Sequence, residues 1–396
     1  MKKDQSFGFD TLAIHGVNEG KHPDFALNAP IFMSSTFQFD SLEEAEEVFS
    51  FDRDQYVYTR GNNPTLKLLE EKIALLEGGA GAVVFSSGMA AISSVLLSLL
   101  KPGDRVLAHR TVYGCSYDFL TKLLPQYEVE CQFANLADEA GVEDLLGEKT
   151  RVIYLETPAN PNLEIIDINR ISQLARYRGI KVVVDNTFAT PYFQNPLVLG
   201  AYVVVHSATK YLCGHGDALG GVAIASDQEY LHRLKFEYLS KLGGVLSPFN
   251  AWLILRGLKT LGVRMRQHQS NALSVARYLQ DHPQIVRVNY PGLPDFPGYE
   301  KAKKQMGGFG GMLSFETKGG LIASRRVVDN LQLAKLAVSL GDAETLVEHP
   351  ASMTHRGYPR EKLQEFGFNE RLIRLSIGLE DQEDIIADLG QALSKL

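Results

Sequence analysis

The feature that most constrains the fold is an alternation of short apolar runs and helical segments between residues 64 and 226. The segment Pro64 to Leu76 repeats leucine and isoleucine at three- and four-residue intervals behind a proline, which predicts a helix. Amphipathic stretches at 141–146 and 169–177 separate several of the apolar runs that follow. These runs are 82–85, 105–109, 151–156, 181–185, 202–207 and 221–226. Strands apolar on both faces and separated by helices predict an α/β fold, with a mostly parallel sheet covered on both sides.

The regular alternation of apolar runs and helical segments ends before about residue 257. A long helical stretch at 267–280 leads to glycine-rich 307–311, a strand at 371–378 and a last helix at 383–396, which together predict a smaller α+β domain. The first 60 residues lack the alternation, so we expect an extended arm that packs on a second subunit. We therefore divide the chain into an N-terminal arm (1–60), a larger ligand-binding domain (61–256) and a C-terminal domain (257–396). A length of 396 residues suits two domains with separate cores.

Charge and cysteine content narrow the class of partner. The 40 basic and 47 acidic residues give a net charge of −7, which argues against binding of nucleic acid or an anionic membrane. The three cysteines have no CxxC spacing, so we expect a reducing compartment and no disulfide framework. The first ten residues hold two lysines without a following apolar region, and the apolar run 89–100 is shorter than the roughly 18 residues that cross a bilayer. We expect a cytoplasmic protein that binds small molecules.

A metal site is not expected. The histidines that could suggest one lack an HExxH motif or a neighbouring cysteine pair. They are His206, His215, His349 and His355.

Three strand ends carry polar residues. Asp185 ends one apolar run, Ser207-Ala208-Thr209-Lys210 ends the next, and the loop 85–89 enters a helix through Ser-Ser-Gly. Taken singly, an aspartate there is usually a turn or cap residue, and a lysine is usually solvated. In parallel sheets, however, ligands bind at the carboxyl ends of the strands. The three ends together bring a carboxylate, a lysine flanked by hydroxyls and a glycine-containing helix start to one edge.

This combination describes a site for pyridoxal phosphate. A helix N-terminus offers unpaired N–H groups and a positive dipole end to a phosphate, and the hydroxyls of Ser207 and Thr209 suit the same anion. The amine of Lys210 would hold the cofactor covalently. The carboxylate of Asp185 would keep the pyridine nitrogen protonated, so that the ring can accept electrons.

Seven motifs in order along the chain resemble the cystathionine γ-synthase-like group of pyridoxal phosphate enzymes, which act in cysteine and methionine metabolism. They are YVYTRGNNPT (56–65), FSSGMAA (85–91), YLETPANPN (154–162), VVVDNTFATP (182–191), HSATKYLCGHGD (206–217), SLGDAETLVEHPASMTH (339–355) and RLSIGLED (374–381). The resemblance implies pyridoxal phosphate fold type I, similar to aspartate aminotransferase, and a homotetramer built as a dimer of dimers.

The resemblance also implies roles for particular residues. Lys210 would hold the cofactor, Asp185 would pair with its ring nitrogen, and Tyr113 would stack on the ring and exchange protons with the substrate. Arg374 would bind the substrate carboxylate through two hydrogen bonds, with Asn160 and Ser339 nearby. The implied phosphate ligands are Gly88, Met89, Ser207 and Thr209, joined by Tyr58 and Arg60 from a neighbouring subunit. The site would then be shared between chains.

Two features favour the methionine-cleaving branch of this group. Its members carry a cysteine where this chain has Cys115, whereas relatives that act on cystathionine usually carry a small residue there. The segment 339–346 reads SLGDAETL, and the cystathionine enzymes tend to read SLGG. Leu239-Ser240 and the segment 356–359 depart from the methionine-cleaving pattern. Cys115 can also be read as a small filler residue.

The expected reaction is γ-elimination of L-methionine to methanethiol, 2-oxobutanoate and ammonia, with L-homocysteine as a second substrate that releases hydrogen sulfide. Three alternatives of the same fold remain open. They are cystathionine cleavage, cystathionine synthesis and sulfhydrylation of an O-acylhomoserine. A non-catalytic binding or regulatory protein of this fold is a further alternative, but the presence of Lys210, Asp185, Tyr113 and Arg374 argues against it.

Overall fold

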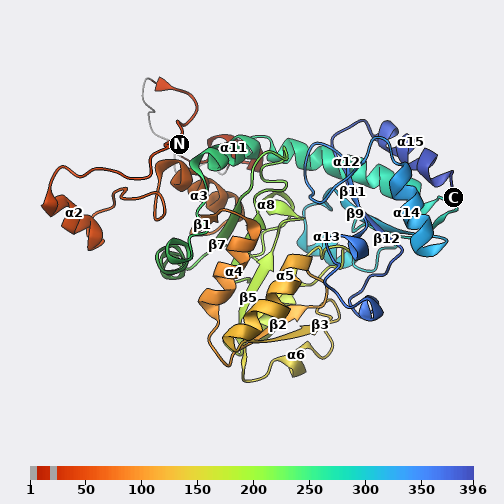
Figure 1. Ribbon diagram of the computed structural model, residues 1–396, viewed down its shortest axis with the longest axis horizontal. Coiled ribbons are helices and arrows are strands. Elements are labelled where there is room, and N and C mark those ends of the chain that lie inside the picture. Colours follow the sequence, from red (N-terminus) through yellow and green to blue (C-terminus); the bar gives the residue numbers. More distant parts are fainter. Residues whose placement is uncertain (1–6, 18–24) are drawn as a thin grey trace.

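A computed structural model describes residues 7–17 and 25–396 of the chain, and Figure 1 shows two sheets with their helices. The larger sheet has seven strands in the order β1-β7-β6-β5-β4-β2-β3. Their bounds are β1 (Gly81–Phe85), β2 (Arg105–His109), β3 (Glu130–Ala134), β4 (Thr150–Glu156), β5 (Lys181–Asp185), β6 (Val203–Ser207) and β7 (Gly221–Ala225). The neighbouring strands β6, β5, β4, β2 and β3 are parallel. β7 runs antiparallel to β6, and β1, at the edge of the sheet, runs antiparallel to β7. The predicted mostly parallel sheet is therefore confirmed.

Helices cover both faces of this sheet. Helix α3 (Pro64–Glu77) and helix α7 (Ile168–Arg176) pack on one face, and α4 (Gly88–Leu99) packs on the other. Successive residues of one strand enter different cores, since Val183 of β5 faces the α4 side and Val184 the α3 side. Both faces are apolar for this reason. Helix α3 begins as predicted, with Pro64 in its first turn and the Asn63 side chain accepting the Thr65 N–H at 2.9 Å.

The second sheet has five strands in the order β10-β11-β12-β9-β8. Their bounds are β8 (Ile285–Asn289), β9 (Met312–Thr317), β10 (Lys335–Leu336), β11 (Leu346–Glu348) and β12 (Leu372–Ser376). Helix α12 (Leu261–Gln280) runs from the larger sheet to this one (Figure 1). Helices α14 (Gly320–Asn330) and α15 (Gln382–Leu393) pack together on the outer side of the second sheet. The smaller α+β domain is therefore confirmed. Residue 257, where we divide the chain, lies within α11 (Pro248–Leu258), and that boundary stays a prediction.

The remaining segments are short. They are α1 (Phe9–His15), α2 (Leu42–Phe49), α5 (Gly114–Asp118), α6 (Val142–Leu145), α8 (Thr190–Phe193), α9 (Gln228–Arg233), α10 (Ser240–Leu242) and α13 (Tyr299–Gln305), with π-helical turns at Phe119–Leu123 and Leu234–Leu239 and 3₁₀ turns at Leu124–Tyr127, Pro350–Ser352 and Arg360–Lys362. Within residues 7–17 and 25–396, no helix is both long and apolar enough to span a bilayer.

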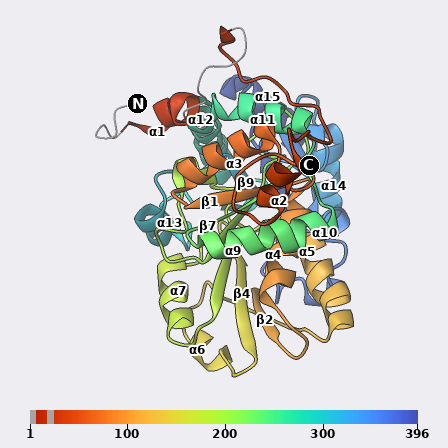
Figure 2. The same cartoon turned by 90° about the vertical axis from the view of Figure 1, so that its left-hand side faces the viewer.

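The part of the N-terminal arm that carries α2 extends away from both sheets (Figure 1), and Figure 2 looks at the molecule from that side. In the part of the arm that the structure describes, α1 packs on α3 and α12, and the other regular features are α2 and an isolated bridge between Thr36 and Tyr58. Apolar side chains of the arm stand in solvent, with Leu42 76% and Phe49 70% exposed. The expectation that the start of the chain is not a signal sequence rests in part on residues 1–6, which lie outside the described residues.

Candidate active site

A cavity of about 700 Å³ lies where the carboxyl ends of β4, β5 and β6 meet the loops of the second sheet. Its size suits a small cofactor with a substrate. The cavity brings together most of the predicted site residues, namely Gly88, Met89, Tyr113, Asn160, Asp185, Ser207, Thr209, Lys210, Ser339 and Arg374. The predicted residues Tyr58, Arg60 and Cys115 do not line it.

The start of α4 closes one end of the cavity. Ser87 caps the helix by accepting the Ala90 N–H at 3.1 Å, and Gly88 lies against the end of β6. A Cβ atom on Gly88 would stand 2.8 Å from the Cβ of Ser207, so only glycine permits this approach. The first-turn N–H groups of a helix lack partners within the helix, and here they adjoin the Ser207 hydroxyl. This end of the cavity can hold a phosphate.

Lys210 follows β6 and presents its amine to the cavity. Its Nζ atom donates a hydrogen bond to the Oγ atom of Ser339 at 2.9 Å. Burial lowers the pKa of Lys210, and the charge of Arg374 lowers it further, while Asp342 and Glu348 oppose the decrease. A lysine with a lowered pKa is more often neutral and can act as a nucleophile or a base.

Two carboxyl groups stand side by side at the floor of the cavity, because Glu156 of β4 pairs in register with Asp185 of β5. Asp185 accepts the Thr187 N–H at 2.9 Å. Burial raises the pKa of Asp185, and the Thr187 hydrogen bonds oppose that increase. Burial and the neighbouring Asp185 raise the pKa of Glu156 well above its usual value. Both carboxyls accept hydrogen bonds, and the pKa increase is larger at Glu156, so the pair favours one negative charge over two.

Tyr113 is held at the cavity by its main chain. Its N–H donates to Oε1 of Glu156 at 2.8 Å, and the next residue, Gly114, packs against the carbonyl of Thr354 from the second domain. Burial, together with a hydrogen bond to Cys115, raises the pKa of the Tyr113 phenol. The phenol therefore keeps its proton at neutral pH and can donate it. Cys115 itself is exposed beside this tyrosine.

Arg374 of β12 is buried at the opposite wall. Its Nη1 atom lies 2.9 Å from Glu348 Oε1 and 2.9 Å from Asn160 Oδ1, and its Nη2 atom donates to the Ser339 carbonyl at 2.8 Å. Within the part of the chain that the structure describes, its buried Nε atom has no hydrogen-bond partner. Ser339 adopts a φ of 113°, a left-handed conformation that is costly for serine. The guanidinium is thus fixed in one orientation and suits a carboxylate ligand.

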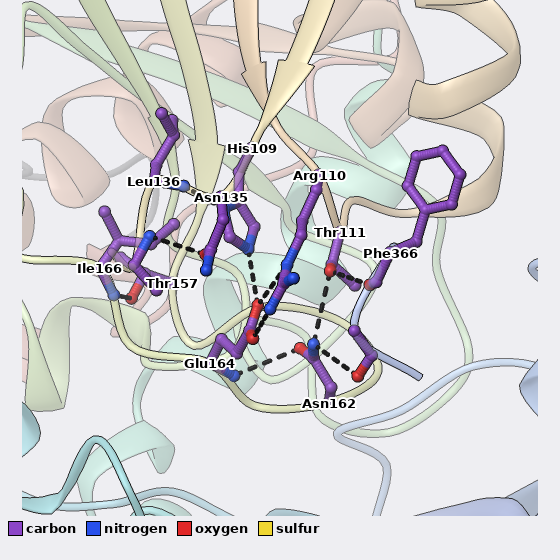
Figure 3. Close-up of polar contacts among 12 residues, drawn as sticks. His109, Arg110, Thr111, Asn135, Leu136, Thr157, Asn162, Glu164, Ile166 and Phe366 are labelled. Atoms are coloured by element: carbon purple, nitrogen blue, oxygen red, sulfur yellow. Dashed lines mark hydrogen bonds and ion pairs between the residues drawn. The ribbon is translucent and has the colours of Figure 1, made fainter. Parts of the chain in front are cut away.

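A polar cluster anchors the loops behind the cavity (Figure 3). His109 at the end of β2 lies 3.1 Å from Glu164, and Arg110 forms an ion pair with the same carboxylate. Burial raises the pKa of Glu164, but hydrogen bonds from His109 and Arg110 outweigh it and lower the pKa to about 2. Asn162 donates to the Gly367 carbonyl at 3.1 Å, which ties this loop to the second domain. The cluster therefore joins the segment that leads to Tyr113 to the loop that carries Asn160.

Three buried acids in or beside the cavity were missed by the sequence analysis. Glu156 ends an apolar run just as Asp185 does, so the strand-end argument could have found it. Asp342 and Glu348 lie in loops and a short strand of the second domain, and only the packing of that domain brings them here.

Two of the predicted phosphate ligands lie elsewhere in this chain. Arg60 donates to the Ser240 carbonyl at 3.2 Å, and Tyr58 is half exposed on the arm.

The cavity residues fit pyridoxal phosphate. The cradle at Gly88, which a Cβ would fill, suits the phosphate, and the buried amine and the hydrogen-bonded carboxylate stand in the same cavity. Among the described residues, no group of three or more histidine, cysteine or acidic side chains is arranged to hold a metal ion.

Comparison with known proteins agrees with this geometry. Residues 10–394 match the family described as Cys/Met metabolism PLP-dependent enzyme. The L-methionine gamma-lyase of Fusobacterium nucleatum subsp. polymorphum is 48% identical over 395 residues, 99% of each chain. The cystathionine gamma-lyase of Dictyostelium discoideum is 41% identical over 395 residues, 100% of each chain. A crystal structure of a putative O-acetylhomoserine (thiol)-lyase from Campylobacter jejuni superposes with a TM-score of 0.94 at 35% identity, covering 98% of this chain and 100% of that one. That structure contains a pyridoxyl-lysine phosphate.

Proposed function

The chain belongs to the Cys/Met metabolism PLP-dependent enzymes, and we propose that it catalyses γ-elimination of L-methionine to methanethiol, 2-oxobutanoate and ammonia. L-Homocysteine is the proposed second substrate and would release hydrogen sulfide. The observation that carries the proposal is the single cavity that joins Lys210, Asp185 and Arg374. The higher identity to an L-methionine gamma-lyase, 48% against 41% for a cystathionine gamma-lyase, supports methionine as the substrate.

The enzyme depends on pyridoxal phosphate, which when bound withdraws electrons from the substrate and so makes its α-hydrogen acidic. Lys210 would hold the cofactor, and its amine, when free, would be the base that removes the substrate's α-proton. Its lowered pKa supports this role, because the base must be neutral before it accepts a proton.

Asp185 holds the proton on the cofactor's ring nitrogen. The neighbouring Glu156 supports this assignment, since the pKa of both carboxyls is raised by burial and the increase is larger at Glu156. The phosphate would bind at the start of α4, where Gly88, Met89, Ser207 and Thr209 of this chain would be its ligands. The Thr209 hydroxyl accepts the Gly220 N–H at 3.0 Å and donates to the Gly220 carbonyl at 3.2 Å, so its proton would turn from that carbonyl to a phosphate oxygen.

Arg374 binds the substrate carboxylate, with Asn160 and Ser339 beside it. Once the α-proton and then a β-proton have left, the γ-substituent can depart as a thiolate. Tyr113 donates the proton that converts this thiolate to a thiol, and its raised pKa supports a proton-donating role. Cys115, hydrogen-bonded to the Tyr113 phenol, would tune this step and favour the methyl thioether.

The active enzyme is proposed to be a homotetramer built from two dimers, with active sites shared between the chains of each dimer. The arm's exposed apolar side chains support contact with a second copy, because large exposed apolar surfaces usually mark interfaces. Tyr58 and Arg60 stand outside their own chain's cavity, which supports a role for them in the phosphate site of a neighbour. A cytoplasmic location stays a proposal that rests on the three unpaired cysteines.

The test compares substrates on the cofactor-loaded protein. L-Methionine, L-cystathionine, and O-acetylhomoserine with sulfide are incubated separately, and 2-oxobutanoate and the released or incorporated thiol are quantified. The proposal predicts methanethiol and 2-oxobutanoate in equal amounts, with slower cleavage of cystathionine. Faster turnover of cystathionine, or replacement without 2-oxobutanoate, would assign the chain to one of the alternative reactions.

Cys115 is tested by substitution in the same assay. Cys115→Gly should lower methionine turnover about tenfold and cystathionine turnover much less, if the thiol selects the substrate. Cys131→Ala is the control, because Cys131 lies on β3 away from the cavity. If Cys115→Gly lowers turnover of both substrates equally, Cys115 only fills space and does not select the substrate.

A further inference from the structure

Asp342 is a buried acid in the cavity that the proposed reaction does not use. It lies in the loop between β10 and β11 and is only 7% exposed. Its Oδ1 atom is buried without a hydrogen-bond partner in the described part of the chain. A buried carboxylate is costly unless a positive charge or hydrogen bonds compensate for it. Asp342 therefore requires a partner, and the cavity supplies one.

Lys210 lines the same cavity as Asp342 and supplies a positive charge there. Burial raises the pKa of Asp342, and the charge of Lys210 is the largest influence that lowers it. The remaining groups around Asp342 are Glu344, which raises its pKa, and the Ser339 hydroxyl and Gly216 N–H, which lower it. A Cβ on Gly216 would stand 3.3 Å from the Asp342 Cγ, so the carboxyl packs directly on the loop that follows Lys210.

The charged groups around Lys210 also favour a pairing of its amine with Asp342. Arg374 of β12 lowers the pKa of Lys210, and the two groups that raise it are Asp342 and Glu348. Glu348 is already engaged, since it lies 2.9 Å from Arg374 and accepts the Thr354 hydroxyl at 2.8 Å. Asp342 is therefore the acid that can balance a charge on Lys210.

Ser339 connects the two residues. Its hydroxyl accepts a hydrogen bond from Lys210 Nζ at 2.9 Å, and a hydroxyl that accepts one bond can donate another. Ser339 lines the same cavity as Asp342 and is among the groups that lower the pKa of its carboxyl. The strained backbone at Ser339, with a φ of 113°, is consistent with a hydroxyl placed for this bridge.

We propose that Asp342 is a positioning residue for Lys210, orienting the amine through the Ser339 hydroxyl and balancing the positive charge that the amine gains when it takes the substrate's α-proton. In that step the Cα–H bond breaks, an N–H bond forms on Lys210, and the electron pair stays on the substrate carbon, where the bound cofactor stabilises it. No oxidant or reductant is consumed. The inference rests on the proposed function, because it takes Lys210 as the base.

The test is Asp342→Asn, which removes the charge and keeps the size of the side chain. The first readout is exchange of the methionine α-hydrogen in D₂O, followed by NMR across pH on the cofactor-loaded enzyme. Loss of the anion destabilises the lysine ammonium, so the midpoint of the acid limb should move down by about one pH unit. The exchange rate at its optimum should fall at least tenfold, because the amine is no longer oriented.

A second readout does not depend on turnover. Only a neutral amine bonds to the cofactor aldehyde, so the rate at which cofactor-depleted protein takes up pyridoxal phosphate reports the state of Lys210. Its pH midpoint should move down by a similar amount in Asp342→Asn. Glu344→Gln is the matched control, since Glu344 is an exposed acid in the same loop and is not among the groups that shift the pKa of Lys210. It should leave both midpoints unchanged.

The possible results distinguish a failure of the proposed function from a failure of the role of Asp342. A wild-type enzyme that neither exchanges the α-hydrogen nor releases methanethiol would overturn the proposed function itself. A wild-type enzyme that does both, with unchanged midpoints in Asp342→Asn, would overturn the role of Asp342 alone. Should Asp342→Asn fail to fold, Asp342→Glu keeps the charge and should retain the wild-type midpoints. A downward shift in Asp342→Glu as large as the one expected from charge removal would contradict the proposal.

Discussion

Lys210 Nζ, at the end of a strand in the larger sheet, donates a hydrogen bond to Ser339 Oγ in the second domain at 2.9 Å. The two residues stand 129 positions apart in the chain, so neither domain alone holds the proposed catalytic amine in place. Arg374 makes a second link of this kind, since it binds Asn160 from the larger domain. The cavity therefore forms only where the two domains pack together.

Gly88→Ala should prevent normal binding of pyridoxal phosphate. The added Cβ would stand 2.8 Å from the Ser207 Cβ and push the start of α4 away from β6. We expect cofactor affinity to fall at least tenfold, measured by spectroscopic titration of cofactor-depleted protein. Gly147→Ala is the control, because its Cβ would meet nothing closer than 3.7 Å. Equal affinities for wild type and Gly88→Ala would refute the phosphate site at this helix start.

Arg374→Lys should weaken substrate binding more than it slows chemistry. An ammonium cannot form the paired hydrogen bonds that a guanidinium gives a carboxylate, so we expect KM to rise about 100-fold with a smaller change in kcat. Arg371→Lys, an exposed position just before the same strand, should leave KM unchanged. Steady-state kinetics with methionine measures both. If KM of Arg374→Lys stays at the wild-type value, the substrate carboxylate binds elsewhere.

Glu164→Gln should destabilise the fold at neutral pH. The folded-state pKa of Glu164 is about 2, below the ordinary value of 4.5, so its ionised form stabilises the fold above about pH 4.5. That contribution, of order 3 kcal/mol, is lost as the pH falls from 4.5 toward 2. Chemical denaturation at fixed protein and cofactor concentration should show a large difference between wild type and variant at pH 7 and a smaller one at pH 4.

The control for this prediction is Glu143→Gln. Glu143 is 65% exposed and lies 3.9 Å from Arg178, and surface pairs of this kind contribute little. Its stability should match the wild type at both pH values. A Glu164→Gln variant as stable as Glu143→Gln at pH 7 would show that the cluster in Figure 3 does not stabilise the loops.

Mixed subunits should reveal whether the site is shared. Arg60→Ala and Lys210→Ala chains should each be inactive or weakly active alone. In a dimer with one chain of each kind, one site would combine Lys210 of the first chain with Arg60 of the second, both unchanged. Random reassociation of equal amounts should then restore about one quarter of wild-type activity. No recovery in dimers shown to be mixed by mass spectrometry would place Arg60 outside the neighbour's site.

The sequence predicted the architecture well where strands are buried on both faces. β5 and β6 are uninterrupted valine runs that end in polar residues, so both the strands and the positions of Asp185 and Lys210 followed from the pattern. β3 was missed because it is an edge strand, in which Glu130 and Gln132 break the apolar pattern. Ser339 and Arg374 could be assigned only through resemblance, because their approach to Lys210 depends on how the second sheet packs on the first. Asp342 shows the same limit, since nothing in its own segment marks it as buried.

The assignment of Lys210 underlies every other role, and one measurement tests it directly. Borohydride reduction of the cofactor-loaded enzyme fixes the cofactor to the amine that holds it, and peptide mass spectrometry then locates the added mass. We predict a phosphopyridoxyl group on Lys210, with trypsin failing to cut after that residue, and no visible absorbance band of a lysine-bound cofactor in Lys210→Ala. Modification of a different lysine, with the band retained in Lys210→Ala, would contradict the account of this site.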